Sequence, residues 1–424
     1  MWTFDSDTDP GYWVEVESPT NATLRDLTST ANGPVAVGDK GVAVGRGNDR
    51  WGVILENGPG ARSQTLHAVD STDDGERLWF AGAGGALGYY DLQTEQRRDY
   101  SKPQGNAGTF YSLTVAGDRG GEKLLVADGS GHVIPAHVRD DSATDVTIGW
   151  ETTPNAGNAV EAIAHDDEGY GYAVDVNSNV FMTTETDGWT RVGVDDAQGS
   201  FYDCAYGDGV FVTGGGNGKV FEAAELTDHD DEATWTPTEL GEFTVYGLDA
   251  GYGGQIACGE GGSIYIRQTG GEWERGKHEP THTFRAGLVD EQMVVVGAGG
   301  LIVERRGPDE ASEETKARHG DGSAGDDGST DGSDGSGDTR GGATDESGST
   351  DDSGQQSSEY ARNEDGGAAN DGTAGDGTNG GTERGIVTDG RTGNVESDID
   401  WRLGSGGGGG TESADGDAFD GRGE

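Results

Sequence analysis

The chain has 424 residues, with 79 acidic and 28 basic side chains and a formal net charge of −51. This balance excludes a nucleic-acid-binding protein, because phosphate contacts require clustered lysine and arginine. Only 31% of the residues are hydrophobic and 80 are glycine, so the chain cannot be one packed core throughout, and part of it is expected to be disordered.

The chain shows no targeting or membrane-spanning signal. Residues 1–7 have neither a basic start nor an apolar stretch, and no run approaches the roughly 18 apolar residues that a membrane helix needs. We therefore expect a cytoplasmic protein with no membrane partner. Cys204 and Cys258 are too few for a disulfide framework, and we interpret both as buried thiols.

The acidic excess extends over the whole chain, and lysine is the rarer base. This pattern is typical of a protein from a cell with molar salt in its cytoplasm, where a Debye length of roughly 3 Å screens self-repulsion. We interpret the acidic surface as a solvating surface adapted to salt. A site for cationic partners is the alternative.

The first predicted element is an acidic leader, residues 1–10. Asp5, Asp7 and Asp9 have the spacing that begins a calcium loop, but Pro10 replaces the required glycine and Val16 the bidentate glutamate. We predict a solvated leader and no metal. The histidines likewise show no zinc spacing.

A glycine-rich turn then recurs seven times between residues 21 and 306, at intervals of 38 to 47 residues. Each turn lies between short apolar stretches with β-branched residues, such as 35–37 and 42–44. Its glycines permit the positive φ angles of a tight hairpin turn. The turns begin at Gly38, Gly82, Asp128, Asp175, Gly215, Gly259 and Gly297.

A second element precedes each turn by 13 to 18 residues and carries a large apolar residue, with a second one three or four positions later. The short segments with flanking Gly, Thr and Asp favour an innermost strand over a helical turn. Small residues between the apolar positions suit strands crowded around a narrow axis. The segments begin at Leu24, Leu66, Phe110, Val160, Phe201, Val245 and Phe284.

A third element follows most turns and carries an aromatic residue, namely Trp51, Tyr100, Trp150, Trp189, Trp235 and Trp273. The seventh repeat enters the tail before such a residue appears. Residues 11–18, with an alternating pattern and Trp13, supply the missing strand. Seven repeats of about 43 residues, each with four short strands, predict an all-β, seven-bladed β-propeller over residues 11–307, closed by the N-terminal strand.

This pattern resembles the BNR or Asp-box propellers, and among them the seven-bladed photosystem II assembly-factor-like (WD40/YVTN/BNR-like) group. The nearest copies of the group's turn motif are residues 184–189 and 268–273, and Trp79 resembles the group's strand before the glycine turn. Most repeats lack the full Asp-Gly-Gly turn. The resemblance implies blade geometry but no particular activity.

Sialidases share the Asp-box, so an enzyme is a possibility to test. Glycoside hydrolysis needs placed carboxylates or a tyrosine nucleophile, with an arginine cluster for an anionic sugar. The innermost strands supply only Arg25 and Arg285, on the first and last blades. We therefore expect no catalytic residues. The glycine-rich segments all join strand to strand, so no nucleotide motif and no cofactor are predicted.

The residue after the first apolar position of each inner strand falls at one level of the predicted channel. We call these residues the axial ring: Arg25, His67, Tyr111, Glu161, Tyr202, Tyr246 and Arg285. Such a mixed surface suits hydrogen bonding and stacking with a peptide or small ligand. The alternative is that the charges are ion-paired or solvated and the tyrosines fill space between blades.

Residues 308–424 are rich in Gly, Asp, Ser and Thr, and we predict a disordered tail. Residues 385–403 concentrate most of its large apolar side chains, either as a motif that folds on a partner or as an incidental patch. Taken together, the sequence predicts a monomeric, non-catalytic propeller scaffold that binds a protein or peptide. A carbohydrate-binding or sialidase-like glycoside hydrolase propeller is the alternative.

Overall fold

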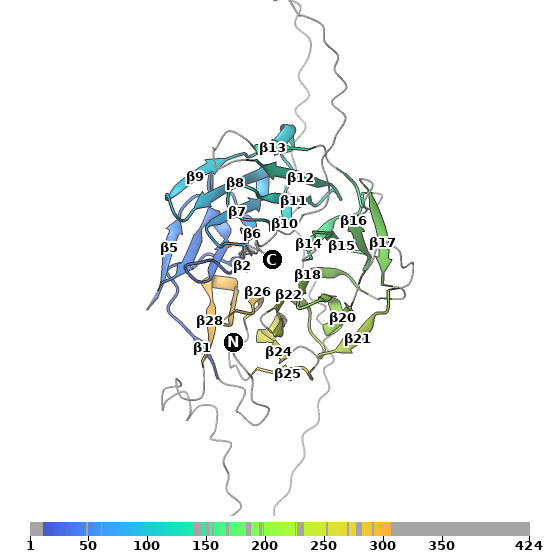
Figure 1. Cartoon of the computed structure of the whole chain (residues 1–424). Coiled ribbons are helices and arrows are strands. Elements are labelled where there is room, and N and C mark those ends of the chain that lie inside the picture. Colours follow the sequence, from blue (N-terminus) through green and yellow to red (C-terminus); the bar gives the residue numbers. More distant parts are fainter. Residues whose placement is uncertain are drawn as a thin grey trace, which may run out of the picture. The chain divides into compact units, whose positions relative to one another are not determined.

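The structure is a computed structural model that describes residues 12–306 except 48–49, 61, 140–145, 150–151, 155–156, 167–168, 184–187, 195–196, 198, 225, 227–232, 252, 269–270, 277–281 and 291. The described residues form seven four-stranded antiparallel sheets. Figure 1 shows these sheets arranged as blades around a central axis. The predicted seven-bladed all-β propeller is therefore confirmed.

The strands of the first four blades, from the axis outward, are β2 (Leu24–Thr28), β3 (Val35–Gly38), β4 (Ala43–Arg46) and β5 (Trp51–Leu55); β6 (Leu66–Ser71), β7 (Arg77–Gly82), β8 (Ala86–Asp91) and β9 (Gln96–Asp99); β10 (Phe110–Ala116), β11 (Lys123–Asp128), β12 (Val133–Val138) and β13 (Val146–Ile148); β14 (Val160–His165), β15 (Gly171–Asp175), β16 (Val180–Thr183) and β17 (Trp189–Gly193).

The strands of the last three blades are β18 (Phe201–Gly207), β19 (Val210–Gly215), β20 (Lys219–Ala224) and β21 (Thr236–Glu239); β22 (Val245–Gly251), β23 (Gly254–Gly259), β24 (Ile264–Gln268) and β25 (Glu274–Arg275); β26 (Phe284–Leu288), β27 (Val294–Gly297), β28 (Ile302–Arg306) and β1 (Tyr12–Glu15). Short 3₁₀ turns are η1 (Asp39–Gly41), η2 (Ala83–Gly85), η3 (Pro103–Gly105), η4 (Gly216–Gly218), η5 (Glu260–Gly262) and η6 (Ala298–Gly300).

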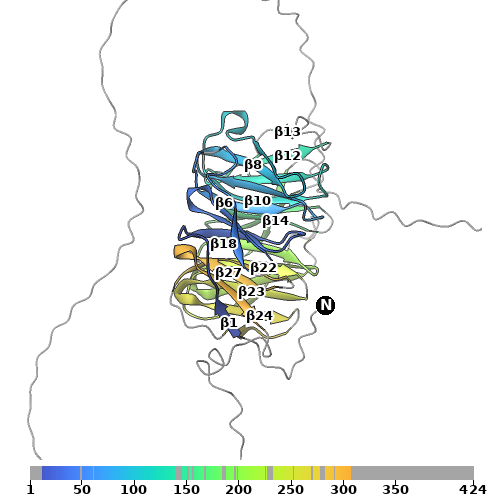
Figure 2. The same ribbon diagram turned by 90° about the vertical axis from the view of Figure 1, so that its left-hand side faces the viewer.

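The N-terminal strand closes the ring, as the sequence predicts. β1 pairs antiparallel with β28 and is the outer strand of the last blade, with Trp13 opposite Arg305. Figure 2 shows β1 beside this blade in the side view. Each inner strand contacts the inner strand of the next blade, and β26 contacts β2, so the ring is continuous.

Each inner strand contains a β-bulge directly after its first residue. In β2, for example, Leu24 pairs with Gly38 and Asp26 with Val37, so Arg25 is the extra residue. The same shift occurs in β6, β10, β14, β18, β22 and β26. A bulge inserts one residue and changes the side-chain alternation. This explains why most of these strands repeat apolar residues three positions apart rather than two.

The recurrent turn glycines are required by close backbone contacts. A Cβ on Gly38 would lie 2.0 Å from the carbonyl oxygen of Thr23, at the entry to the inner strand of the same blade. A Cβ on Gly85 would lie 2.4 Å from the carbonyl oxygen of Asn106, in the connection to the next blade. The turn sequence therefore encodes packing within and between blades.

The core is divided among the interfaces between blades. Seven apolar clusters of described residues each join two adjacent blades, and together they include every neighbouring pair around the ring. The cluster between the last and first blades contains Ile302 and Trp51, for example. Cys204 and Cys258 are buried free thiols in two of these clusters, which confirms their interpretation.

Several sequence predictions concern residues outside the described part of the chain. These are the acidic leader with its calcium-like spacing, Trp150, the tail with residues 385–403, and portions of the two Asp-box-like turns. Along the described residues, no helix has the length and apolar character needed to cross a membrane.

Candidate functional site

The axial-ring residues occupy equivalent positions on the seven inner strands. Each of the seven is the bulged residue near the start of an inner strand, beside the glycine turn of its own blade. A bulge redirects a side chain out of the regular pleat, and bulges recur next to functional sites. Tyr111 is 39% exposed and the other six ring residues are half-buried.

Three ring residues on consecutive blades form a contact series. The rings of Tyr202 and Tyr246 lie with their centroids 5.5 Å apart, and the guanidinium of Arg285 lies 4.5 Å from the centroid of Tyr246. The Nε atom of Arg285 is buried and has no hydrogen-bond partner among the described residues. Arg285 therefore carries an unused donor at the channel end.

The ring residues of the first three blades make one aromatic contact and one ion pair. His67 and Tyr111 meet edge to face with ring centroids 5.4 Å apart. Arg25 forms an ion pair with Asp39, with Nε and Oδ1 2.7 Å apart. Burial, and then the charge of Arg25, lowers the pKa of His67 to about 4, so this histidine is neutral at pH 7. The ion pair between Arg25 and Asp39 agrees with the alternative interpretation of the ring, in which its charged residues are ion-paired or solvated.

Four aspartates that sequence analysis did not select line the inner strands below the ring. Each carboxylate accepts one backbone N–H from the residue that follows it and one from the next blade. Asp26 accepts from Val69 at 2.8 Å, and equivalent bonds join Asp70 to Val115, Asp203 to Leu248 and Asp249 to Val289. These carboxylates fasten neighbouring inner strands.

Burial raises the pKa of all four aspartates. The pKa reaches about 6 for Asp26 and Asp70 and about 7 for Asp249, while that of Asp203 rises well above its ordinary value. The backbone donors oppose this shift but do not cancel it. No group of three or more His, Cys, Asp or Glu within the described ranges is arranged to hold a metal ion.

From the sequence, Asp26 and Asp203 are interpreted only as short residues that relieve crowding. The recurrence of aspartate at this position in two repeats was the available signal for a shared role. The backbone N–H that each aspartate binds in the next blade lies about one repeat further along the chain. Among the described ring residues, Arg25 and Arg285 are the arginines, and Glu161 is the single carboxylate. This set does not contain the arginine cluster that an anionic sugar requires.

No family model and no curated protein matches the chain. Solved structures of similar fold include YCF48 bound to D1 peptide, with a TM-score of 0.54 and 14% identity over 70% of this chain and 96% of that one. The WD40 propeller domain of Doa1 has a TM-score of 0.56 and 12% identity over 73% and 99%.

The third neighbour is a catalytically inactive virginiamycin B lyase from Staphylococcus aureus with quinupristin. Its TM-score is 0.57 and its identity 12%, over 69% of this chain and 98% of that one. At these identities the similarity establishes the propeller fold alone. Peptide-bound and enzymatic propellers share this fold. The BNR type and the origin from a halophile stay predictions.

Proposed function

We propose that the chain is a non-catalytic β-propeller that binds a protein or peptide partner at the axial ring. The observation that supports this proposal is the series of contacts from Tyr202 to Tyr246 to Arg285, which places two aromatic rings beside one guanidinium. Aromatic and arginine side chains are enriched among the residues that dominate protein interfaces. YCF48 bound to D1 peptide is a propeller of similar fold with a peptide ligand.

The guanidinium of Arg285 favours a carboxylate on the partner at this part of the ring. Arg25 is neutralised by Asp39 and His67 is neutral, whereas Arg285 makes no ion pair with the described residues. A buried donor without an acceptor costs about 1–3 kcal/mol, so a carboxylate that accepts from Arg285 removes this cost on binding. An acidic side chain or a C-terminal carboxylate beside an apolar residue fits this site.

A peptide display library tests this proposal. Screening in several-molar KCl is expected to enrich peptides with a carboxylate next to aromatic or apolar residues. Arg285→Gln is expected to weaken a selected peptide by about tenfold or more, the range of a hydrogen bond to a charged group. Arg97→Gln, at an exposed position of the outer strand β9 and outside the axial ring, is the matched control and is expected to change affinity little.

The outcomes separate the proposal from its alternative. Peptide affinity that is insensitive to Arg285→Gln would contradict the role of this guanidinium. A glycan array probed in parallel would favour the carbohydrate-binding or sialidase-like alternative if glycans, and not peptides, bind. Cytoplasmic location, the monomeric state and adaptation to salt are part of this proposal, and stability in dilute and in molar salt tests the last of them.

A further inference from the structure

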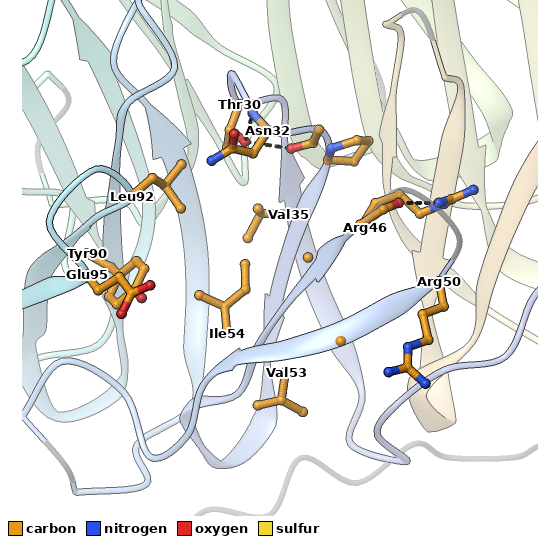
Figure 3. Close-up of a pocket in the computed structure, with 15 residues that line it drawn as sticks. Thr30, Asn32, Val35, Arg46, Arg50, Val53, Ile54, Tyr90, Leu92 and Glu95 are labelled. Atoms are coloured by element: carbon orange, nitrogen blue, oxygen red, sulfur yellow. Dashed lines mark hydrogen bonds between the residues drawn. The ribbon is translucent and has the colours of Figure 1, made fainter.

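Two hollows on the first two blades differ in charge. The larger, a groove of about 680 Å³, is lined by both basic and acidic side chains, and Figure 3 shows Arg50 and Glu95 at opposite sides of it. Its lining therefore has no preference for an anion or a cation. The smaller hollow, of about 230 Å³, has Arg62 and Lys102 as its charged lining residues among those described. We call it the second-blade pocket.

The second-blade pocket adjoins the axial ring. It is lined by residues of the connection from β5 to β6, of the turn between β7 and β8, and of the connection from β9 to β10. Leu66, the first residue of β6, also lines the pocket and directly precedes His67 of the axial ring. A peptide that binds the axial ring at the second blade therefore lies next to this pocket.

The pocket suits one acidic side chain. Clefts for whole small ligands usually have volumes of about 300–1,000 Å³, and this pocket is smaller. Its lining offers the ammonium of Lys102, the amide of Gln64 and the hydroxyl of Ser101 as hydrogen-bond donors. The Ser101 hydroxyl accepts the N–H of Leu87 at 3.4 Å and keeps its own hydrogen for donation. A carboxylate, which only accepts, matches these donors.

Lys102 is the unpaired cation of this pocket. The charge of Arg62 is offset by Asp99, with Nη2 and Oδ2 3.5 Å apart. The side chain of Lys102 is exposed and makes no hydrogen bond or ion pair within the described part of the chain. Of the seven connections that lead into an inner strand, residues 100–109 alone have a net positive charge, with histidine counted as neutral. An acidic protein thus keeps a cation at this place.

The backbone of Lys102 lies in the left-handed region, at φ 60° and ψ 54°, where glycine is favoured over other residues. Its N–H donates to the carbonyl of Gly85 at 2.7 Å, and its carbonyl accepts from the N–H of Gly105 at 2.9 Å. Glycine would make both backbone contacts with less strain. The turn itself therefore does not require lysine, and strained residues of this kind cluster at binding sites.

We propose that the peptide bound at the axial ring inserts an Asp or Glu side chain into the second-blade pocket, where Lys102 pairs with its carboxylate. This inference rests on the proposed function, because one peptide occupies both sites. Arg285 on the last blade takes one carboxylate and Lys102 on the second blade takes another. Arg25, on the first blade between them, is already paired with Asp39. The partner is thus an acidic peptide with two separated carboxylates.

Charge reversal on both sides of the contact tests this inference. The probe is a peptide selected from the display library, together with variants in which each acidic residue in turn is replaced by Lys. Lys102→Glu is expected to weaken the parent peptide by about tenfold, because repulsion replaces attraction. One of the peptide variants is expected to recover most of this loss on the Lys102→Glu protein. Arg97→Glu, an equal charge reversal at an exposed position of β9, is the matched control and is expected to change affinity little.

Lys102→Gly separates binding from folding. Glycine fits the left-handed backbone, so the melting temperature is expected to equal or exceed that of the parent. The affinity for the parent peptide is expected to fall about threefold to fivefold, the range of an ion pair at an exposed site. Unchanged affinity in both Lys102 variants, or a loss in Lys102→Glu that no peptide variant recovers, would overturn the inference.

Arg285→Gln on the same peptide distinguishes this inference from the proposed function. A peptide that responds to Arg285→Gln but to neither Lys102 variant would overturn the inference alone. A peptide that responds to the Lys102 variants but not to Arg285→Gln would contradict the role of Arg285 in the proposed function.

Discussion

The indole nitrogen of Trp51 donates a hydrogen bond to the carboxylate of Glu304 at 2.8 Å, although 253 residues separate them. Glu304 is fully buried and also accepts from Arg46 and Arg306. Trp51 belongs to the first blade and Glu304 to the last. This contact therefore joins the two blades at which the ring closes.

The first prediction follows from this closure. Glu304→Ala leaves the indole and two guanidinium groups without their acceptor in a buried site. Breaking a buried ion pair in this way costs about 3–5 kcal/mol, so we expect a clearly lower melting temperature. Glu15→Ala, at an exposed position of β1 in the same blade, is the control. Equal melting temperatures of the two variants would contradict the assigned role of Glu304.

The second prediction concerns the N-terminal strand. Trp13 is 2% exposed and packs among the apolar residues between the sixth and seventh blades. Trp13→Ala is expected to destabilise the protein by about 3–5 kcal/mol, and removal of residues 1–18 by more, because an edge of the last blade is then exposed. Thermal unfolding measures both, with the exposed Glu17→Ala as control. A truncated chain that melts within a degree or two of the parent would refute closure by this strand.

The sequence predicts the propeller because local contacts repeat in every blade. Gly38 and its equivalents approach the entry of an inner strand so closely that a side chain does not fit, and this requirement recurs at a fixed spacing. The axial ring follows from the same alignment of repeats. The contacts within the axial ring do not follow from this alignment, because the pairing of Arg25 with Asp39 and of Tyr202 with Tyr246 depends on side-chain geometry.

Contacts between blades are the part that sequence analysis misses. Asp26 reaches Val69 in the next repeat, and Trp51 reaches Glu304 at the far end of the fold. No periodic pattern records which polar group of one repeat meets which group of another.

The third prediction is a pH dependence of stability. The pKa of Asp26 and Asp70 is raised from 3.8 to about 6, and that of Asp249 to about 7, so the folded state retains protons that the unfolded state releases. The stabilisation is complete below pH 3.8 and is lost as the pH rises through 6–7. We expect the melting temperature to be several degrees higher near pH 5 than near pH 8.

His67 opposes this trend, because its lowered pKa favours folding at higher pH, but four aspartates act in the other direction. Asp249→Asn is expected to reduce the dependence between about pH 5 and pH 8, since it removes one of these protons. A melting temperature that is constant or rises from pH 5 to pH 8 would show that the channel aspartates do not control stability in this range.

The fourth prediction concerns salt. The charges of this chain sum to −51 and repel one another. In dilute buffer this repulsion extends over about 10 Å, whereas in molar salt it is screened within roughly 3 Å. We expect transfer from several-molar KCl to dilute buffer to reduce the free energy of unfolding by several kcal/mol. Denaturant titration at both salt concentrations gives this difference. Equal stability at both concentrations would refute adaptation to high salt.

The fifth prediction tests the axial ring. Tyr111→Ala, Tyr202→Ala and Tyr246→Ala each remove an aromatic side chain at the channel end. If these residues bind a partner, each variant is expected to weaken binding by about 2 kcal/mol or more while the fold persists. If the tyrosines only fill space between blades, stability falls and binding is lost only in proportion to unfolding.

The most direct measurement records melting temperature and affinity for one selected peptide on the same Tyr246→Ala protein. Tyr246 contacts both Tyr202 and Arg285, so its removal interrupts the proposed binding surface at its centre. We predict a melting temperature close to that of the parent and an affinity reduced about thirtyfold, which corresponds to 2 kcal/mol. Unchanged affinity in a folded Tyr246→Ala protein would contradict binding at the axial ring.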